Sequence, residues 1–341
     1  MAGSRFITLV CALTLATAAC SATRVGPGPA ASSPVSTTPG SSGPAAASAG
    51  ATCATVPEPT GITGWGPPAQ TPTLTPFLVT NAIACGQSRI LFLYLDAKNQ
   101  PSSQPDRTAK VSFYDLGRDP NKAVATVEGT FVWTIANERG MYVVDVNLPE
   151  AGTWGAEFTT EAPGVAAETV RLSFTVRDSL PTIRIGQRVP ASKTPTAADV
   201  GGDLTKISTD KKPDPAFYST SVADAVAAHK PFMLIFATPK FCTSAQCGPT
   251  LERFKAIAAA HPDITFINVE PYQLKVVDGQ LQPVLDANSQ LQATAVTDQW
   301  GLLSEPWIFA VDRNGIARGS YEVTITDKEV ESIIPVLTAG G

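Results

Sequence analysis

The chain has 341 residues, of which 16% are charged, and its formal net charge is −5 with an isoelectric point near 5.2. This length exceeds that of one ordinary domain and suffices for about two separate cores. The acidic balance and the low charge density exclude the basic surface by which nucleic-acid-binding proteins are recognised, so we expect no nucleic-acid partner.

The first 20 residues have the layout of a secretory signal. A single positive charge at Arg5 precedes an apolar run over residues 6–16, which is too short to span a membrane as a helix. Small residues then stand before Cys20. This end resembles the lipobox of bacterial lipoproteins, although Thr17 stands where leucine is usual. The resemblance implies lipidation of Cys20 and an extracytoplasmic protein anchored to the bacterial cell membrane; an ordinary signal cleaved nearby is the alternative.

Residues 21–72 are dominated by proline, alanine, serine, glycine and threonine. Such a composition buries too little apolar surface to offset the conformational entropy lost on ordering. We therefore predict a disordered stalk between the anchor and the first folded domain.

Residues 73–180 consist of short apolar or alternating runs separated by turn residues. The runs are PFLVT, RILFLYL, KVSFYDL, TFVWTI, MYVVDVNL, TWGAEF and VRLSFTV. Short strands at this spacing, without helical periodicity between them, are typical of an antiparallel sandwich. In the last run the alternation predicts that Leu172, Phe174 and Val176 share one face.

The corner formed by Pro149, Gly152 and Trp154 resembles the Pro-x-x-Gly-x-Trp/Tyr corner of immunoglobulin-like domains in bacterial exported proteins. The resemblance implies an immunoglobulin-like β-sandwich, a fold that hosts many unrelated roles. Histidine is absent from this region and its acidic residues are scattered, so we interpret it as a spacer or protein-contact module. Residues 181–214 are again proline-rich and polar, which predicts a linker.

Six cysteines are present, of which one lies in the predicted signal and Cys20 is the predicted lipid site. Disulfides persist in the compartments that exported proteins occupy. The other four cysteines allow three pairings. Closeness in sequence favours Cys242 with Cys247, which leaves Cys53 with Cys85 as a structural bridge between the stalk and the first strands.

The predicted cysteine pair lies at a turn from a strand into a helix. Residues 232–236 form an apolar run bounded by breakers, which predicts a buried strand. After the cysteines, apolar residues recur at helical spacing as far as Ala260. The exposed amides and the positive end of a helix dipole stabilise a thiolate. A strand over residues 265–269, a hairpin over residues 308–323 and a capping box that opens a last helix complete the pattern.

This order of elements resembles the thioredoxin-like superfamily over residues 215–341, most closely its membrane-tethered, extracytoplasmic members. Residues 300–309, WGLLSEPWIF, match the spacing of the family's aromatic-Gly-Ile-x-x-x-Pro-Thr signature. The resemblance implies that Pro306 is a cis-proline facing the cysteines and that the backbone of Glu305 pairs with a bound thiol substrate. The whole chain is therefore predicted to be multidomain, an all-β immunoglobulin-like sandwich followed by an α/β thioredoxin-like domain.

Three features depart from the family pattern. Four residues separate Cys242 from Cys247, where thioredoxins have two. Ile235 occupies the place where many thioredoxins hold a buried acid that takes up a proton. The residues between Val269 and Val296 are also a longer insertion than the family minimum.

We predict a cell-envelope thiol-disulfide oxidoreductase that acts on exported protein thiols or disulfides without a cofactor or metal. In this hypothesis Cys242 attacks, Cys247 resolves, and Pro306 with Glu305 presents the substrate strand. The direction of electron flow stays open, because it depends on loop sterics and on the thiol chemistry.

Three alternatives remain open. The pair could be a structural disulfide in a non-catalytic binding or scaffold lipoprotein. A thiol peroxidase would have proline and threonine where this sequence has Ile235 and Pro239. A copper chaperone would use soft thiolates for Cu(I), but such proteins have a three-residue spacing, and His229 and His261 lie at helix ends.

Overall fold

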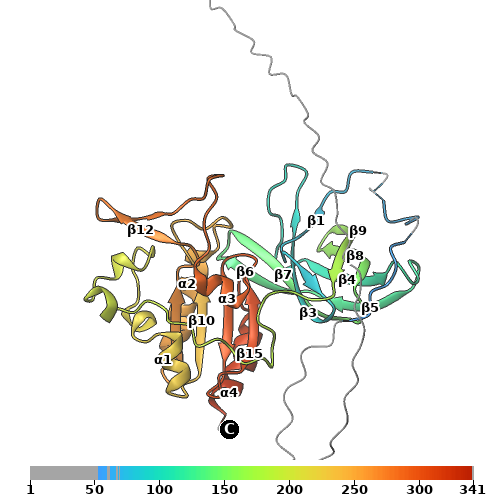
Figure 1. The fold of residues 1–341 in the computed structure, drawn as a ribbon. Helices are drawn as coiled ribbons and strands as arrows, with labels where there is room; N and C mark the ends of the chain where they lie inside the picture. The colour runs from blue at the N-terminus through green and yellow to red at the C-terminus, as the bar shows by residue number, and fades with distance from the viewer. Residues whose placement is uncertain (1–52, 60–61, 67, 69, 340–341) are drawn as a thin grey trace, which may run out of the picture. The chain divides into compact units, whose positions relative to one another are not determined.

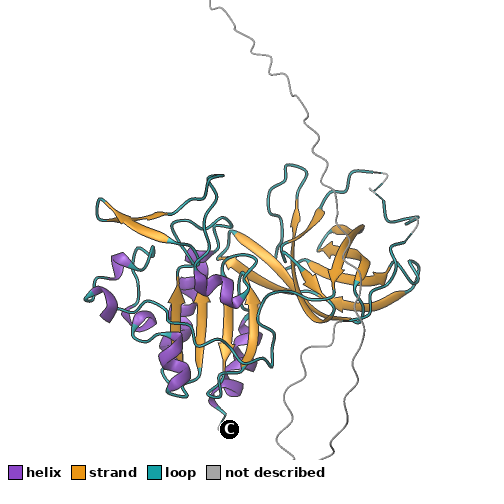
Figure 2. Cartoon of the chain, viewed as in Figure 1, coloured by secondary structure: helices purple, strands orange, loops and turns teal. Residues whose placement is uncertain are grey.

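The structure is a computed structural model that describes residues 53–59, 62–66, 68 and 70–339, all of which belong to one compact unit. The predicted signal, Cys20 and most of the predicted stalk lie outside these residues. The described part is rich in β-structure, with fifteen strands, four α-helices and three short 3-10 helices (Figure 1, Figure 2). None of the helices in this part is both long and apolar enough to cross a membrane.

Two sheets make up the first part of the described chain, which we call the two-sheet region (residues 75–177). The four-stranded sheet contains, in spatial order, β1 (Thr75–Leu78), β3 (Gly86–Leu95), β7 (Arg139–Leu148) and β6 (Thr130–Ile135). The five-stranded sheet contains, in spatial order, β2 (Ile83–Ala84), β9 (Val165–Arg177), β8 (Gly152–Ala162), β4 (Thr108–Asp115) and β5 (Ala123–Glu128). Neighbouring strands are antiparallel, except that β2 and β9 are parallel.

The core of the two-sheet region lies between these sheets, because inward side chains from both belong to one hydrophobic cluster. The rings of Phe92 and Tyr142 in the four-stranded sheet stack with centroids 5.4 Å apart. Phe92 also meets Phe158 of the five-stranded sheet edge to face, at 4.9 Å. Edge-to-face and offset aromatic pairs add stability beyond the area that they bury.

The seven predicted strands are present, and the alternation predicted in β9 is confirmed. Leu172, Phe174 and Val176 all pack on the cluster between the sheets. Strand β5 was not predicted. Its sequence, AVATVE, consists largely of small and polar residues, and all six positions are exposed or only half-buried at the edge of the sheet, so the hydrophobic signal of a strand is weak there.

The last part of the predicted stalk packs against the two-sheet region. Val56 is buried, and the side chain of Trp65 is only 5% exposed. The Trp65 ring meets Tyr114 edge to face with centroids 4.9 Å apart. A Cβ at Gly155 would lie 2.3 Å from this ring, so glycine leaves the space that the indole fills. The prediction of a disordered stalk up to residue 72 is therefore wrong for residues 53–59 and 62–66, because the burial of Val56 and Trp65 offsets the entropy lost on ordering them.

A third sheet, with both parallel and antiparallel strands, forms the centre of residues 215–339, which we call the mixed-sheet region. Its strands are, in spatial order, β11 (Thr265–Val269), β10 (Phe232–Phe236), β14 (Trp307–Val311) and β15 (Ala317–Glu322). Strand β10 is parallel to β11 and antiparallel to β14, and β14 is antiparallel to β15. A separate hairpin, β12 (Leu274–Val277) with β13 (Gln280–Pro283), lies within the predicted insertion.

Helices cover both faces of the mixed sheet. They are α1 (Val222–Ala227), α2 (Cys247–Ala260), α3 (Ala295–Trp300) and α4 (Asp327–Thr338). Alternate residues of β10 enter two different clusters: Met233 and Ile235 pack with side chains of α2 and α4, and Phe232, Leu234 and Phe236 pack with those of α1 and α3. The predicted buried strand is confirmed, since all five of its residues are fully buried.

Residues 181–214, predicted to be a linker, pack on the mixed-sheet region instead. Val189 is buried in the cluster beneath α1 and α3, and Leu204 in the cluster beneath α2 and α4. Two 3-10 helices, η1 (Ala198–Val200) and η2 (Leu204–Lys206), lie within the segment, and η3 (Pro215–Tyr218) follows it. Val189 and Leu204 are isolated apolar residues in a proline-rich segment and show no periodicity. The sequence pattern therefore did not predict that they are buried.

Arg89 of β3 connects the two regions. Its guanidinium donates to the Glu329 carboxylate at 2.5 Å and to the carbonyl oxygens of Thr324 and Glu322 at 2.9 and 3.2 Å. Beside this ion pair, Val323 is buried among side chains of β3, β6 and β7. A partly buried charge-assisted contact of this kind is stronger than an exposed ion pair.

We expect Trp65→Ala to lower the free energy of unfolding by about 3 kcal/mol, because it removes a large buried side chain. Urea denaturation followed by circular dichroism measures the change. Phe77→Ala is the control, since Phe77 is 53% exposed and its loss should cost no more than ~0.5 kcal/mol. Equal effects of the two substitutions would mean that residues 53–66 do not pack on the two-sheet region.

Candidate functional site

The two predicted disulfides are both present. Cys53 and Cys85 are bonded with their Cα atoms 6.3 Å apart, and Cys242 and Cys247 with theirs 6.0 Å apart. The first bridge joins the end of the predicted stalk to the residue between β2 and β3. The second closes a short loop between the end of β10 and the start of α2, as the sequence predicted.

The loop that the second disulfide closes extends several residues before the N-cap of α2. Gln246 is the N-cap residue of α2, and Cys247 is the first residue of the helix. Cys242 therefore precedes the helix by several residues. Ala245 turns the loop with a left-handed φ of 60°, and the Ser244 hydroxyl accepts the backbone N–H of Gln246 at 3.3 Å.

The two sulfur atoms have different surroundings. The backbone N–H of Cys247, at the start of α2, donates to Sγ of Cys242 at 3.2 Å, and the Ser244 hydroxyl lies 3.4 Å from the same sulfur. Cys242 is half-buried, whereas Cys247 is fully buried against Leu251 and Phe254. Donors of this kind favour negative charge on the sulfur that they reach, and here both donors reach Cys242.

The Glu305–Pro306 peptide bond is cis, as expected. It comes immediately before β14, which is hydrogen-bonded to β10. The carbonyl oxygen of Glu305 accepts the Ser244 hydroxyl at 3.1 Å. This contact brings the residue predicted to present a substrate strand next to the cysteine loop.

The side chain of Glu305 also belongs to the site, which the sequence did not predict. It is only 4% exposed, and its Oε1 accepts the backbone N–H and the hydroxyl of Thr243 at 2.9 and 2.8 Å. Its Oε2 accepts the hydroxyl of Tyr272. Burial, followed by the neighbouring carboxylate, raises the pKa of Tyr272 well above its usual value, so this phenol stays protonated as a donor.

Sequence reasoning missed the Glu305 side chain because its partners are far away along the chain. Thr243 and Tyr272 are 62 and 33 residues distant. One signal was available: a glutamate directly before a proline expected to face the cysteines must lie near them.

Cys242, Cys247 and Glu305 form a group in which the two sulfurs and one carboxylate oxygen lie within 4.8 Å of one another. These residue types can hold a soft or borderline metal ion when the cysteines are reduced. The histidines of the copper hypothesis do not join them. His229 lies against the carbonyl oxygen of Arg313, and His261 follows the 14-residue helix α2, which places it ~20 Å along the axis from Cys247.

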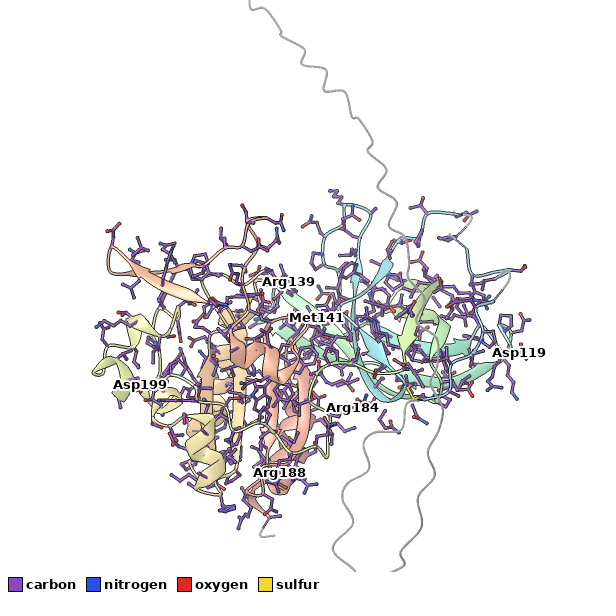
Figure 3. The ribbon with its side chains drawn as sticks, viewed as in Figure 1. Asp119, Arg139, Met141, Arg184, Arg188 and Asp199 are labelled. Atoms are coloured by element: carbon purple, nitrogen blue, oxygen red, sulfur yellow. A yellow bond between two sulfur atoms is a disulfide. The ribbon has the colours of Figure 1, made fainter. Side chains whose placement is uncertain are left out.

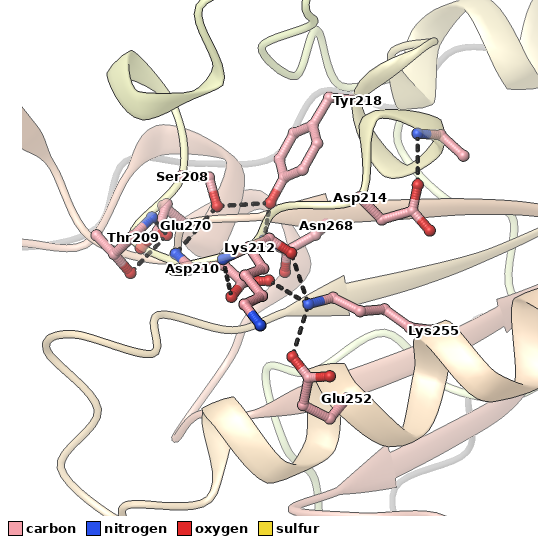
Figure 4. A network of polar contacts seen from close by, with 11 residues as sticks. Ser208, Thr209, Asp210, Lys212, Asp214, Tyr218, Glu252, Lys255, Asn268 and Glu270 are labelled. Atoms are coloured by element: carbon pink, nitrogen blue, oxygen red, sulfur yellow. Dashed lines mark hydrogen bonds and ion pairs between the residues drawn. The ribbon is translucent and has the colours of Figure 1, made fainter.

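A buried polar network lies at the same end of the sheet (Figure 4). Oε1 of Glu270, the residue after β11, accepts the backbone N–H and the hydroxyl of Thr209 at 2.6 and 2.8 Å. Tyr218 donates to Ser208 at 2.7 Å and accepts from Asn268 at 2.9 Å. The network therefore fixes the segment before η3 onto β11. Burial raises the pKa of Glu270 from 4.5 to about 7.

The two-sheet region also reaches the cysteine loop. Arg139, at the start of β7, is labelled in Figure 3. It donates to the carbonyl oxygen of Ser244 at 3.4 Å. A pocket of about 590 Å³ lies elsewhere, lined in part by Arg89, Ile183 and Trp307, and neither Cys242 nor Cys247 lines it. This pocket is therefore not part of the cysteine site.

Comparison with known proteins gives no family. No protein-family model and no curated protein matches the sequence. The chain is similar to a DUF4426 family protein from Pseudomonas aeruginosa PAO1, with 15% identity and a TM-score of 0.21, over 28% of this chain and 76% of that one. It is also similar to MtrC from Shewanella baltica OS185, with 15% identity and a TM-score of 0.21, over 46% of this chain and 29% of that one. TM-scores this low do not establish a shared fold, so the site is interpreted from its own residues.

We expect Glu270→Gln to flatten the dependence of stability on pH. The folded-state pKa of Glu270 is raised from 4.5 to about 7, so the folded protein holds a proton that the unfolded chain has already lost. This contribution is full at acid pH and is lost as pH rises through that window, by about 3 kcal/mol in total. Urea denaturation at a series of pH values measures the difference between the two curves.

The matched control for this prediction is Glu252→Gln, an exposed glutamate on α2 paired with Lys255. It should leave the pH dependence of the wild-type protein unchanged. A Glu270→Gln variant with the same slope as the wild type would contradict the raised pKa.

Proposed function

We propose that this protein is a thiol-disulfide oxidoreductase of the bacterial cell envelope, held at the membrane by a lipid on Cys20. The observation that carries the proposal is the asymmetry of the cysteine pair. Cys242 is half-buried and receives the first amide of α2 at 3.2 Å, whereas the Cys247 bonded to it is fully buried. An accessible attacking thiolate with a protected resolving partner is the arrangement that thiol-disulfide exchange requires.

We further propose that the mixed-sheet region is a thioredoxin-like domain. Its support is the element order: a strand, the cysteine-bearing helix, a parallel strand, a short helix, a cis-proline, a hairpin and a last helix. The sheet order, with β10 between β11 and β14, is consistent with this assignment. The cis-proline lies beside the cysteine loop, because the hydroxyl of Ser244 binds the carbonyl oxygen of the preceding residue, Glu305.

We assign the two-sheet region to an immunoglobulin-like sandwich, on the support of its two sheets and the buried Trp154 at the start of β8. Its contact with the cysteine loop through Arg139 suits a module that limits which exported proteins approach the sulfurs. The clients are therefore exported protein thiols or disulfides that reach the loop from its open side.

In the proposed reaction the Cys242 thiolate attacks a sulfur of a client disulfide and forms a mixed disulfide. Cys247 then attacks Cys242 and releases the client thiol, which leaves the bridge present in the structure. The same steps in reverse order oxidise a client dithiol. The reduction potential of the pair decides which direction prevails.

We expect the reduced protein to catalyse the reduction of insulin disulfides by dithiothreitol, with activity lost in Cys242→Ser. Cys247→Ser should instead accumulate mixed disulfides through Cys242, because the resolving thiol is missing. Turbidity of the insulin B chain and non-reducing electrophoresis measure these effects. The matched control, Cys53→Ser with Cys85→Ser, should retain the activity.

A structural role for the bridge gives the opposite result. Equilibration with glutathione buffers would then return a reduction potential below about −300 mV. That potential, combined with an unreactive Cys242, would refute the proposed oxidoreductase activity. It would favour a non-catalytic binding or scaffold protein in which the disulfide is structural.

Cys20→Ser should move the protein from the membrane fraction to the soluble fraction of an expressing bacterium. The reason is that the proposed lipid is attached to this sulfur, while no described helix is suited to cross a membrane. Incorporation of an alkyne-tagged fatty acid measures lipidation directly. Label retained in Cys20→Ser would contradict the anchor.

A further inference from the structure

We propose that the reduced cysteine pair binds a zinc ion together with the carboxylate of Glu305. The protein ligands are the thiolates of Cys242 and Cys247 and one carboxylate oxygen of Glu305, and water takes the fourth position of a tetrahedral ion. The sequence did not predict a metal here. This site goes beyond the proposed oxidoreductase and does not depend on that activity.

The spacing of the ligand atoms is the first support. The two sulfurs and one carboxylate oxygen of Glu305 lie within 4.8 Å of one another. A tetrahedral zinc ion, with bonds of about 2.3 Å to sulfur and ~2.0 Å to oxygen, needs ligand atoms about 3.5–3.8 Å apart. Reduction breaks the bond between the sulfurs, and the separation that zinc then requires falls within the size of this group.

Hydrogen bonds already orient two of the three ligand groups. The backbone N–H and the hydroxyl of Thr243 donate to Oε1 of Glu305 at 2.9 and 2.8 Å, and the hydroxyl of Tyr272 donates to Oε2. A carboxylate has about four acceptor sites, so one remains for an ion. The backbone N–H of Cys247 donates to Sγ of Cys242 at 3.2 Å. Partners of this kind hold metal ligands in place and raise the affinity for the ion.

The carboxylate is buried without a cation beside it. Glu305 is only 4% exposed, and none of the ion pairs in the described part of the chain includes it. Near the loop, Arg139 donates to the carbonyl oxygen of Ser244 at 3.4 Å, and Lys240 to that of Leu281 at 3.1 Å. Buried charges are normally paired or bound to a metal. A dication therefore supplies the positive charge that these side chains do not.

The mixture of ligand atoms selects the ion. Thiolates suit soft ions and carboxylates suit hard ones, and Zn²⁺ is a borderline ion that takes both. Ca²⁺ and Mg²⁺ take oxygen ligands, which excludes them from a site with two sulfurs. Cu(I) prefers sulfur ligands, so the carboxylate favours Zn²⁺ over Cu(I).

Zinc binding and disulfide formation exclude each other. Each thiol loses its proton to solvent when it binds the ion, so a bound ion displaces two protons. A disulfide oxidant removes two electrons from the pair, which forms the bridge present in the structure and releases the ion. Reduction by a thiol or a phosphine returns the two electrons. The zinc site therefore exists only in the reduced protein.

The test is a Zn²⁺ titration of the full-length protein against a chromogenic chelator. The protein is reduced with a phosphine and freed of reductant in the absence of oxygen. We expect it to bind one more Zn²⁺ per chain than the reduced Cys242→Ser, Cys247→Ser double variant, whose other cysteines measure the background. The protein with its disulfides intact should show no such site. Equal binding by the double variant or by the oxidised protein would overturn the inference.

Single substitutions test the carboxylate. We expect Glu305→Gln to weaken zinc binding about 100-fold, because a neutral amide is a poor ligand, and Tyr272→Phe to weaken it about tenfold, because only an orienting hydroxyl is lost. With Co²⁺ as the probe, the thiolate-to-cobalt charge-transfer band should persist in both variants, which shows that the cysteine loop is folded.

Glu270→Gln is the matched control, since it removes another buried carboxylate at the same end of the sheet and should bind Zn²⁺ as the wild type does. If Glu305→Gln also binds Zn²⁺ with the affinity of the wild type, the carboxylate is not a ligand and the inference is overturned.

Discussion

The complete burial of β10 is the constraint on which the candidate site depends. All five of its residues are fully buried, and they can be so only with a strand on each side and helices over both faces. The residues after Phe236 therefore leave the mixed sheet at the end where β11 ends and β14 begins. Cys242 and Pro306 are far apart in sequence, and both follow or precede a strand at this end of the sheet.

The cysteine loop is held by contacts that differ in kind. The disulfide and the first amide of α2 fix the sulfurs. The hydroxyls of Thr243 and Ser244 bind the side chain and the backbone of Glu305. These contacts hold a buried carboxylate beside the sulfurs.

The segments expected to be loose are parts of the packed structure. Trp65 and Val56 hold the end of the predicted stalk on the two-sheet region, and Cys53 is bonded to Cys85 there. Val189 and Leu204 hold residues 181–214 on the mixed sheet.

The sequence by itself predicted seven strands of the two-sheet region, the buried strand β10, the cysteine-bearing helix and the favoured pairing of Cys242 with Cys247, because periodicity, breakers and cysteine spacing are local signals. The cis peptide bond at Pro306 was expected only from the resemblance of residues 300–309 to a family signature. Only the tertiary structure decided that Glu305 is buried beside the sulfurs, that Glu270 binds Thr209, and that Trp65 fills the space above Gly155. Each of these contacts joins residues that are far apart in sequence or that lie in a segment without periodicity. Hydrogen bonds hold Glu305 and Glu270, and packing holds Trp65; the partners in each case come from distant parts of the chain, so a pattern of neighbouring residues does not indicate them.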